Sequence, residues 1–207
     1  MLDGRQVSAS LSVGVAVAGA IVFETHSITT DNEAGVATGW LDGQLSERGR
    51  ALAIELGRRR RNDGVAAIFA SDLGRAVETV ELAFGGSGIP VHLDARLREC
   101  DYGAWNGMPV SWLERERAQR ISRPFPGGES YLQVVARVGS FLEDLAHDWD
   151  GARVVVVGHS ATRWALDHLL GGATLHDLVV ARFVWQEGWS YVLPEGWQPA
   201  QLGGLLS

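Results

Sequence analysis

The stretch Arg153-Val154-Val155-Val156-Val157-Gly158-His159-Ser160 decides the fold class of this 207-residue chain. Its four consecutive valines form an apolar run that is typical of a strand buried on both faces of a parallel sheet. The run leads through Gly158 into a segment, residues 160–170, that we expect to be helical, because Ser160 opens it and two glycines end it. A buried strand that passes directly into a helix is typical of an α/β domain.

Outward from this strand, strand-like and helix-like segments alternate along the chain. The sequence predicts further strands at 19–23, 65–70 and 90–93, and helices at 46–61, 72–84, 111–121 and 130–149. Residues 183–185 and 189–193 are expected to close the domain as a hairpin. The pattern predicts a single α/β domain, a three-layer αβα sandwich with a mostly parallel central sheet. We assign this domain to residues 17–207 and expect residues 1–16 to form a disordered N-terminal extension.

Length and composition argue against several classes of protein. A chain of this length buries roughly 70% of its unfolded surface on folding, so it needs no disulfide or metal for stability. The net charge of −7 at pH 7 argues against a nucleic-acid partner. The arginine run at 58–61 is then expected to be a solvated helix end. The lone Cys100 favours a reducing interior.

An apolar run at residues 11–23 allows two interpretations of the N-terminal region. Behind Arg5, and with alanines at alternate positions, it resembles the apolar part of a signal peptide. It is too short to span a membrane as a helix, which takes about 20 apolar residues. We favour a buried strand, because the residues that follow form a chemical motif that cleavage would damage. The expected location is cytoplasmic, and no membrane partner is expected.

Residues with chemical potential collect where the expected strands end. His26 follows the first strand, Arg75 lies shortly after the second, and His159 follows the valine strand. Ligands of open α/β sheets bind outside the carboxyl ends of the strands, where helix N-termini also offer N–H groups to an anion. A single histidine at such a place is most often structural. Two histidines that face an arginine predict a pocket for a phosphoryl group.

Six segments carry, in order, a resemblance to a known family. They are residues 25–32 (THSITTDN), 38–49 (TGWLDGQLSERG), 71–76 (SDLGRA), 97–103 (LRECDYG), 126–130 (PGGES) and 158–163 (GHSATR). Together they resemble the histidine phosphatase superfamily, the phosphoglycerate-mutase-like enzymes, over about residues 19–193. No single segment is decisive, but all six in this order are highly specific.

The resemblance implies a role for each candidate residue. His26 would attack phosphorus and form a phosphohistidine, and Glu99 would protonate the leaving oxygen and then activate water. Arg75 and His159 would hold the phosphoryl oxygens. The other residues expected to bind phosphate are Ser27, Asn32, Thr38, Gly39, Ser160 and Arg163. No metal or other cofactor is expected, because a neutral imidazole is nucleophilic near pH 7 without one.

Three positions depart from the family's pattern. Thr25 stands where the family has a phosphate-binding arginine, so the opening motif reads T-H-S in place of R-H-G. Ser27 replaces a glycine, and Val36 stands where many members have another arginine. A hydroxyl thus replaces a charged, bidentate group. Because the loss of one such partner costs about 1.5–3 kcal/mol, a dianionic phosphate should bind less well.

This charge deficit leaves three interpretations open. In the first, which we favour, another arginine compensates, with Arg163 as the candidate and Arg96 or Arg98 behind it. In the second, the enzyme is a divergent member that takes an unusual or less charged substrate, or that runs a related phosphotransfer or mutase reaction. In the third, catalysis has lapsed and the domain only binds a ligand. The retention of all four catalytic candidates counts against the third.

The sequence therefore predicts an enzyme, a metal-independent histidine acid-type phosphatase that hydrolyses a small-molecule phosphate monoester. Phosphatase outranks mutase by family analogy, because the family's mutases are longer, with an added loop and a C-terminal tail. Here the interval from Glu99 to Glu129 and the tail after Pro194 are short. The expected partner is the phosphate ester, with a homodimer as an open alternative.

Overall fold

A computed structural model describes residues 17–149 and 151–199. The N-terminal extension expected at residues 1–16 lies outside the described residues, as does the first part of the apolar run at 11–23. The rest of that run is a strand, β1 (Val17–Thr25), which pairs along its length with the valine strand β6 (Ala152–Gly158). The signal-peptide alternative is not tested by this strand.

Five strands form the central sheet, in the order β4-β3-β6-β1-β7. The strands β3 (Ala67–Ala70) and β4 (Val91–Leu93) run parallel to β6 and β1, and only β7 (Trp189–Pro194) is antiparallel. The valine strand lies in the middle of the sheet, and Val154 to Val157 are all buried. The predicted mostly parallel α/β fold is thereby confirmed.

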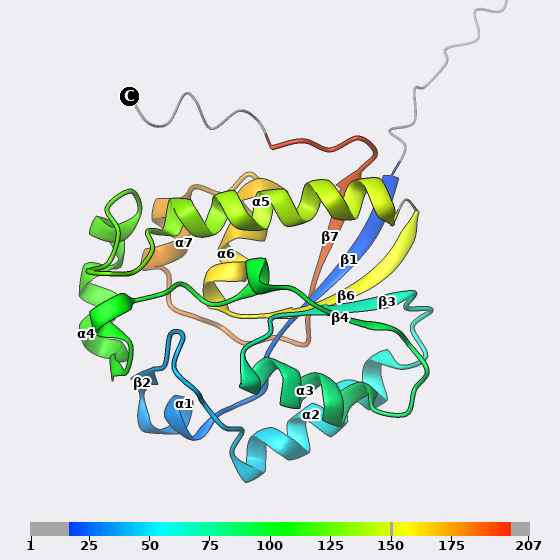
Figure 1. The fold of residues 1–207 in the computed structure, drawn as a ribbon, viewed down its shortest axis with the longest axis horizontal. Coiled ribbons are helices and arrows are strands. Elements are labelled where there is room, and N and C mark those ends of the chain that lie inside the picture. Colours follow the sequence, from blue (N-terminus) through cyan, green and yellow to red (C-terminus); the bar gives the residue numbers. More distant parts are fainter. Residues whose placement is uncertain (1–16, 150, 200–207) are drawn as a thin grey trace, which may run out of the picture.

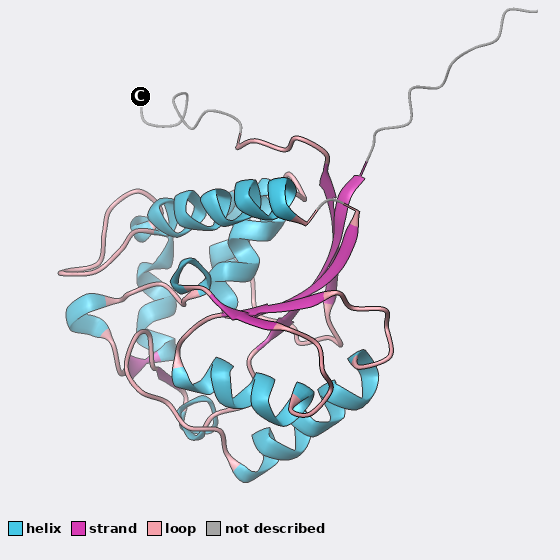
Figure 2. Cartoon of the chain, turned by 45° about the vertical axis from the view of Figure 1, so that its right-hand side comes forward, coloured by secondary structure: helices cyan, strands magenta, loops and turns pink. Residues whose placement is uncertain are grey.

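Helices cover both faces of this sheet, so the domain has three layers. The helices α5 (Tyr131–Asp148) and α6 (Ser160–Leu169) lie on one face, and α2 (Glu47–Arg60) and α3 (Gly74–Phe84) lie on the other (Figures 1 and 2). Val154 and Val156 pack into the core under α5, whereas Val155 and Val157 pack into the core under α2 and α3. Each valine is needed because each face of β6 is covered.

Shorter elements complete the fold. Helix α1 (Thr30–Ala34) follows β1, and β2 (Val36–Ala37) pairs with β5 (Met108–Pro109) ahead of α4 (Val110–Glu116) and α7 (Leu175–Val180). Three 3-10 turns lie at Ala95–Leu97, Gly103–Trp105 and Arg117–Arg120. The sequence pattern missed α1 and α7, because one or two turns of helix are too short to show an apolar period. Among the described residues, no helix is long and apolar enough to cross a membrane.

The predicted helix starts are confirmed for α2 and α5 and wrong for α3. Ser46 and Ser130 cap their helices by accepting N–H bonds from the third helical residues. Helix α3 begins at Gly74 and not at Asp72, because the hydroxyl of Ser71 accepts the N–H of Leu73 at 3.3 Å and holds a turn there. The later start places Arg75 in the first turn of α3.

The predicted closing hairpin is wrong in its first half. Residues 183–185 form no strand and are exposed, whereas β7 pairs with β1, with Trp189 opposite Phe23. Strand β1 offers β7 an unpaired row of N–H and C=O groups, and pairing with it satisfies them. Gly188, at φ +81°, turns the chain into β7.

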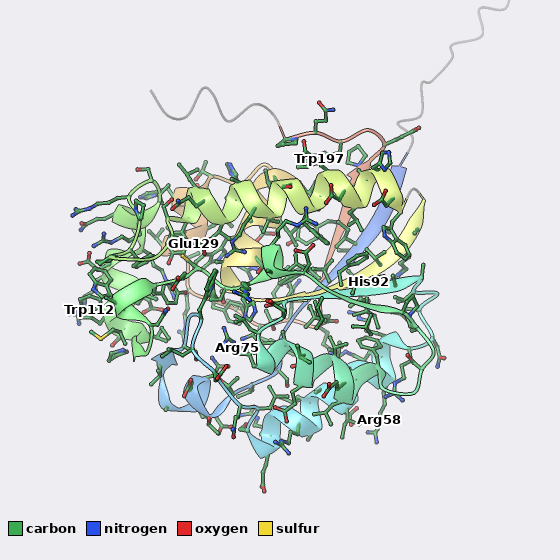
Figure 3. The ribbon with its side chains drawn as sticks, viewed as in Figure 1. Arg58, Arg75, His92, Trp112, Glu129 and Trp197 are labelled. Carbon is green, nitrogen blue, oxygen red and sulfur yellow. The ribbon has the colours of Figure 1, made fainter. Side chains whose placement is uncertain are left out.

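The prediction of a solvated arginine run is wrong for Arg59 and Arg60, which are half-buried and lie against the buried Glu24, whereas Arg58 and Arg61 are exposed. The Nε–H of Arg60 donates to Oε1 of the buried Glu24 at 2.8 Å, and Arg61 donates to the carbonyl of Ala83. Arg58, at the outer side of α2, does point into solvent (Figure 3). The last turn of α2 lies close to β1, and Arg60 therefore neutralises the carboxylate of Glu24, a buried residue of that strand.

Candidate active site

The ends of β1 and β6 bring two histidines together. Thr25, the last residue of β1, lies opposite Gly158, the last residue of β6, and the N–H of His26 donates to the carbonyl of Gly158 at 2.8 Å. His159 begins the turn into α6. The two imidazole rings lie with their centroids 4.9 Å apart at an angle of 51°. The two histidines thus lie side by side, as expected for residues at the carboxyl ends of adjacent parallel strands.

One hydrogen bond fixes the tautomer that we assign to His26. Its Nδ1 lies 2.7 Å from the carbonyl oxygen of Ser27, an acceptor, so Nδ1 carries the proton and donates it. The lone pair is then on Nε2. Burial, together with the positive charge of Arg75, lowers the pKa of His26 to about 3. At neutral pH this imidazole is therefore uncharged.

Arg75 is the cation of the site. It is 2% exposed and lies in the first turn of α3, on the sheet side of that helix (Figure 3). Its Nη2 donates to the carbonyl of Gly39 at 2.7 Å and to Nδ1 of His159 at 3.3 Å, and its Nη1 donates to the carbonyl of Leu41 at 3.3 Å. A guanidinium has five N–H donors. Its Nε–H and one Nη1–H have no hydrogen-bond partner among the residues that the structure describes.

His159 presents an unpaired donor. Because Nδ1 accepts from Arg75, the proton of the neutral ring lies on Nε2, which is buried and has no hydrogen-bond partner among the described residues. Burial and the charge of Arg75 hold the pKa of His159 well below its ordinary value. A buried donor without an acceptor costs free energy. The cost is removed when an anionic oxygen binds beside Nε2.

Glu99 lies at the N-terminal turn of α6, near enough to Arg75 to act on it electrostatically. Its Oε1 accepts the N–H of Cys100 at 2.8 Å and the N–H of Ala161 at 3.2 Å, and the residue is 8% exposed. Its backbone carbonyl accepts from Trp40 Nε1 at 2.6 Å and from Arg137 Nη2 at 2.9 Å. Backbone and side chain are both held, so the carboxylate has a fixed position.

Thr38 and Gly39 lie close to the site and support it. Gly39 adopts φ +57°, and a Cβ there would lie 1.8 Å from Oδ1 of Asn106, so only glycine fits. Its carbonyl is the acceptor that orients Arg75. Thr38 donates its hydroxyl to Oδ2 of Asp31 at 2.8 Å. Thr38 thus contacts α1, and Gly39 contacts the first turn of α3.

Ser27 and Asn32, two of the residues expected to bind phosphate, make structural contacts. The N–H of Ser27 donates to Oγ1 of Thr79 at 3.0 Å, and its hydroxyl donates to the carbonyl of Gly49 at 2.6 Å, so both donors are used. Asn32 is exposed and caps its own helix α1. Ser160 is the first residue of α6 and is half-buried beside His159.

Arg163, the favoured substitute for the missing arginine, has other partners. Its Nε lies 3.4 Å from Oδ2 of Asp167, and its guanidinium lies over the rings of Phe183 and Trp189, at 5.4 Å and 5.0 Å from their centroids. None of these described contacts is with the two histidines or with Arg75.

Arg96 and Arg98, the other two candidates to replace the missing arginine, also form ion pairs. Arg98 forms a bidentate ion pair with Asp72, with both N–O distances 2.6 Å. Arg96 pairs with Asp94 at 2.7 Å and with Asp144 at 2.6 Å. Each guanidinium is thus neutralised by carboxylates of its own.

Sequence reasoning missed Arg137, which supports Glu99 from α5. It donates to the carbonyls of Arg96 and Glu99, at 2.6 Å and 2.9 Å, and pairs with Glu129 at 2.9 Å. Glu129 in turn accepts the N–H of Asp101 at 2.9 Å. A signal was available, since Arg137 interrupts the apolar stripe of α5, where a charge indicates a buried partner.

A hollow of about 350 Å³ lies apart from this site, between β4 and the second half of α5. His92 and Trp149 are among its lining residues, and Figure 3 shows His92 well away from Arg75. No group of three or more metal-ligating side chains was found among residues 17–149 and 151–199.

Comparisons with known proteins give a consistent result. A family model, histidine phosphatase superfamily (branch 1), matches residues 21–183. Probable phosphoglycerate mutase GpmB of Salmonella paratyphi B is 29% identical over 188 residues, which cover 83% of this chain and 86% of that protein. The solved structure of Bacillus stearothermophilus YhfR is similar at a TM-score of 0.74 and 27% identity, over 86% of this chain and 97% of that one. A mycobacterial glucosyl-3-phosphoglycerate phosphatase is similar at a TM-score of 0.67 and 28% identity, over 77% and 82%.

Proposed function

Because the chain belongs to branch 1 of the histidine phosphatase superfamily, we propose that it is a metal-independent phosphatase that hydrolyses a small-molecule phosphate monoester. The observation that carries the proposal is the pair of neutral histidines, 4.9 Å apart, with Arg75 bonded to one of them. A half-buried nucleophile, His26, thus lies beside a buried unpaired donor, His159, and a buried cation, Arg75. That set is what phosphoryl transfer to a histidine requires.

In the first step, Nε2 of His26 attacks phosphorus and the bond from phosphorus to the leaving oxygen breaks. The ring gains a positive charge, which the bond from Nδ1–H to the carbonyl of Ser27 stabilises. Glu99 is the general acid that protonates the leaving oxygen, a contribution of typically 10²–10⁴-fold. The geometry supports this role because its carboxylate is fixed at the turn that carries His159.

Arg75 and His159 stabilise the transferring group. The free N–H groups of Arg75 and the Nε2–H of His159 are already oriented before substrate binds, so little reorganisation is needed as charge develops on the phosphoryl oxygens. In the second step, Glu99 takes a proton from water, and the resulting hydroxide attacks phosphorus. The P–N bond breaks, its electron pair returns to Nε2 of His26, and inorganic phosphate is released.

A cytoplasmic location fits the buried, free Cys100. A reducing compartment keeps such a thiol unpaired.

The proposal is tested by turnover of an aryl phosphate in the presence of a chelator. Wild-type protein should release phosphate, and His26→Ala should lose at least a thousandfold in kcat. His147→Ala is the matched control, because His147 is an exposed histidine far along α5 and its loss should change nothing. Turnover that survives in His26→Ala would refute the proposed nucleophile.

A mutase is the second candidate, and the name of the Salmonella relative favours it. A phosphohistidine can return its phosphoryl group to another hydroxyl of the same substrate in place of water. A phosphate ester with a second free hydroxyl separates the two functions. Release of inorganic phosphate supports the phosphatase, whereas migration of the ester without release supports the mutase.

A further inference from the structure

The described charges around Arg75 are its own guanidinium and two carboxylates. Arg75 is the cation that has free N–H groups there. Two carboxylates, Glu99 and Asp31, lie near enough to act electrostatically on Arg75. Asp31 approaches it from the first turn of α1, since a Cβ on Gly43 would lie 3.6 Å from both Arg75 Cδ and Asp31 Oδ2. One positive charge thus faces two negative charges.

The other charged groups of the surrounding elements are paired elsewhere. On β1, Glu24 is bound by Arg60, and Thr25, which lies opposite Gly158 and directly before His26, carries no charge. On α5, Arg137 is bound by Glu129.

The remaining groups near the site do not change this balance. On α6, Arg163 is bound by Asp167. Tyr102 is neutral at ordinary pH, because burial raises the pKa of its hydroxyl. His26 and His159 are neutral as well. No second cation is therefore available to Nε2 among the described residues.

We propose that the site selects the singly charged form of its substrate, a phosphate monoester monoanion, and that Thr25 sets this preference. The inference rests on the proposed phosphatase function. A dianion would bring two negative charges to Arg75 beside the carboxylate of Glu99. A monoanion matches the single cation, and its hydroxyl can donate to Glu99.

The proton on the monoanion is also the proton that the reaction needs. It passes from the phosphoryl oxygen to Glu99 and from there to the leaving oxygen as the P–O bond breaks. The lone pair of His26 Nε2 forms the new P–N bond. The products are a neutral alcohol and a phosphohistidine with a doubly charged phosphoryl group on a singly positive ring, so charge and protons balance.

The test is the pH dependence of kcat/KM for a series of aryl phosphates that differ in ring substituents and hence in their second pKa. For a phosphate monoester this pKa is about 6. Above it, kcat/KM should fall about tenfold per pH unit, and the midpoint of the fall should follow the second pKa of each ester. A midpoint that is the same for every ester, or a kcat/KM that rises with pH, overturns the inference.

Variants of Thr25 provide the second arm. Thr25→Arg and Thr25→Lys add a cation. The ratio of kcat/KM at pH 8 to kcat/KM at pH 5 should therefore be at least tenfold higher in these variants than in the wild type. Thr25→Val removes the hydroxyl without adding charge, and its profile should keep the wild-type shape. An unchanged profile in both cationic variants, with folding confirmed by circular dichroism, contradicts the role of Thr25.

The two proposals fail in different ways. Turnover that depends on His26 but shows no fall at high pH removes only the preference for the monoanion. Absence of His26-dependent turnover at every pH removes the phosphatase and the preference together.

Discussion

Two imidazole hydrogen bonds set the chemistry at the scale of single residues. The carbonyl of Ser27 holds a proton on Nδ1 of His26 and frees Nε2 for attack, whereas Arg75 holds His159 in the opposite tautomer and makes its Nε2 a donor. One ring can act as nucleophile and its neighbour as a hydrogen-bond donor. The same residue type takes two roles because its hydrogen-bond partners differ.

At this scale the sequence predicts positions better than contacts. His26, His159, Arg75 and Glu99 come together as expected, because strand ends and helix starts are visible in the pattern. The side-chain directions of Ser27 and Arg163 were not visible, since they depend on acceptors and rings contributed by distant segments. That Arg163 is bound by other partners, and so does not replace the missing arginine, is therefore visible only in the structure.

Replacement of Glu99 by glutamine tests its two proposed steps separately. With a nitrophenyl ester, whose leaving oxygen needs little protonation, the first step should survive and the attack of water should slow, so kcat should fall about 10²–10⁴-fold. Phosphorylated protein should then accumulate and be visible by intact mass after quenching. Glu114→Gln, at an exposed carboxylate on α4, is the control. An unchanged kcat in Glu99→Gln would remove this residue from the mechanism.

At the scale of elements, α5 holds the segment that carries Glu99. Arg137→Met removes hydrogen bonds to two carbonyls of that segment and leaves Glu129 without its ion pair. We expect kcat to fall about 100-fold, since small displacements of a catalytic group have effects of this size, and KM to change little. The free energy of unfolding, measured in urea, should fall by roughly 3 kcal/mol.

Arg58→Met is the matched control for this prediction, because Arg58 is an exposed arginine at the end of another helix. It should leave both kcat and stability unchanged. If Arg137→Met lowers stability but leaves kcat at the wild-type value, then the hydrogen bonds of Arg137 stabilise the fold without positioning Glu99.

The ion pair of Glu24 and Arg60 joins β1 to the end of α2. Glu24 is 3% exposed, and burial raises its pKa despite the arginine. Arg60→Met leaves this carboxylate with only the longer contact to Arg59, at 4.0 Å, and should cost about 3 kcal/mol of unfolding free energy. The double variant Glu24→Leu, Arg60→Met should recover most of that loss, because two apolar groups replace the pair. Equal stability of the single and double variants would contradict this.

The elements themselves were partly predictable. Long helices and the buried valine strand follow from residue spacing and helix caps. The pattern wrongly pairs residues 189–193 with 183–185, whereas β7 pairs with β1. Pairing depends on which strand edge is free, and the sequence near Trp189 does not contain that information. The segment at 183–185 has strand-like residues but pairs with none of the described strands.

At the scale of the whole molecule, the buried neutral histidines make stability depend on pH. The pKa values of His26 and His159 are lower in the folded than in the unfolded state, so the unfolded chain binds more protons below pH 6.5. Stability should be full above that pH. It should then be lost as pH falls towards 3, by about 1.4 kcal/mol per pH unit for each histidine.

Urea unfolding between pH 7 and 4 measures this slope. His26→Asn should lower the slope of unfolding free energy against pH by the contribution of one histidine. His147→Asn, at an exposed histidine, should leave the slope unchanged. A slope in His26→Asn equal to that of the wild type would mean that His26 is protonated in the folded protein at acidic pH and would contradict the assigned neutral state.

The central claim is that a phosphoryl group is transferred to His26, and one measurement tests it most directly. Wild-type protein is mixed with an aryl phosphate, quenched within milliseconds at alkaline pH, where phosphohistidine is kept intact, and analysed by peptide mass spectrometry. We predict one added phosphoryl group, located on His26 and absent from His26→Ala. A reaction that releases phosphate while His26 stays unmodified at every quench time would contradict the account.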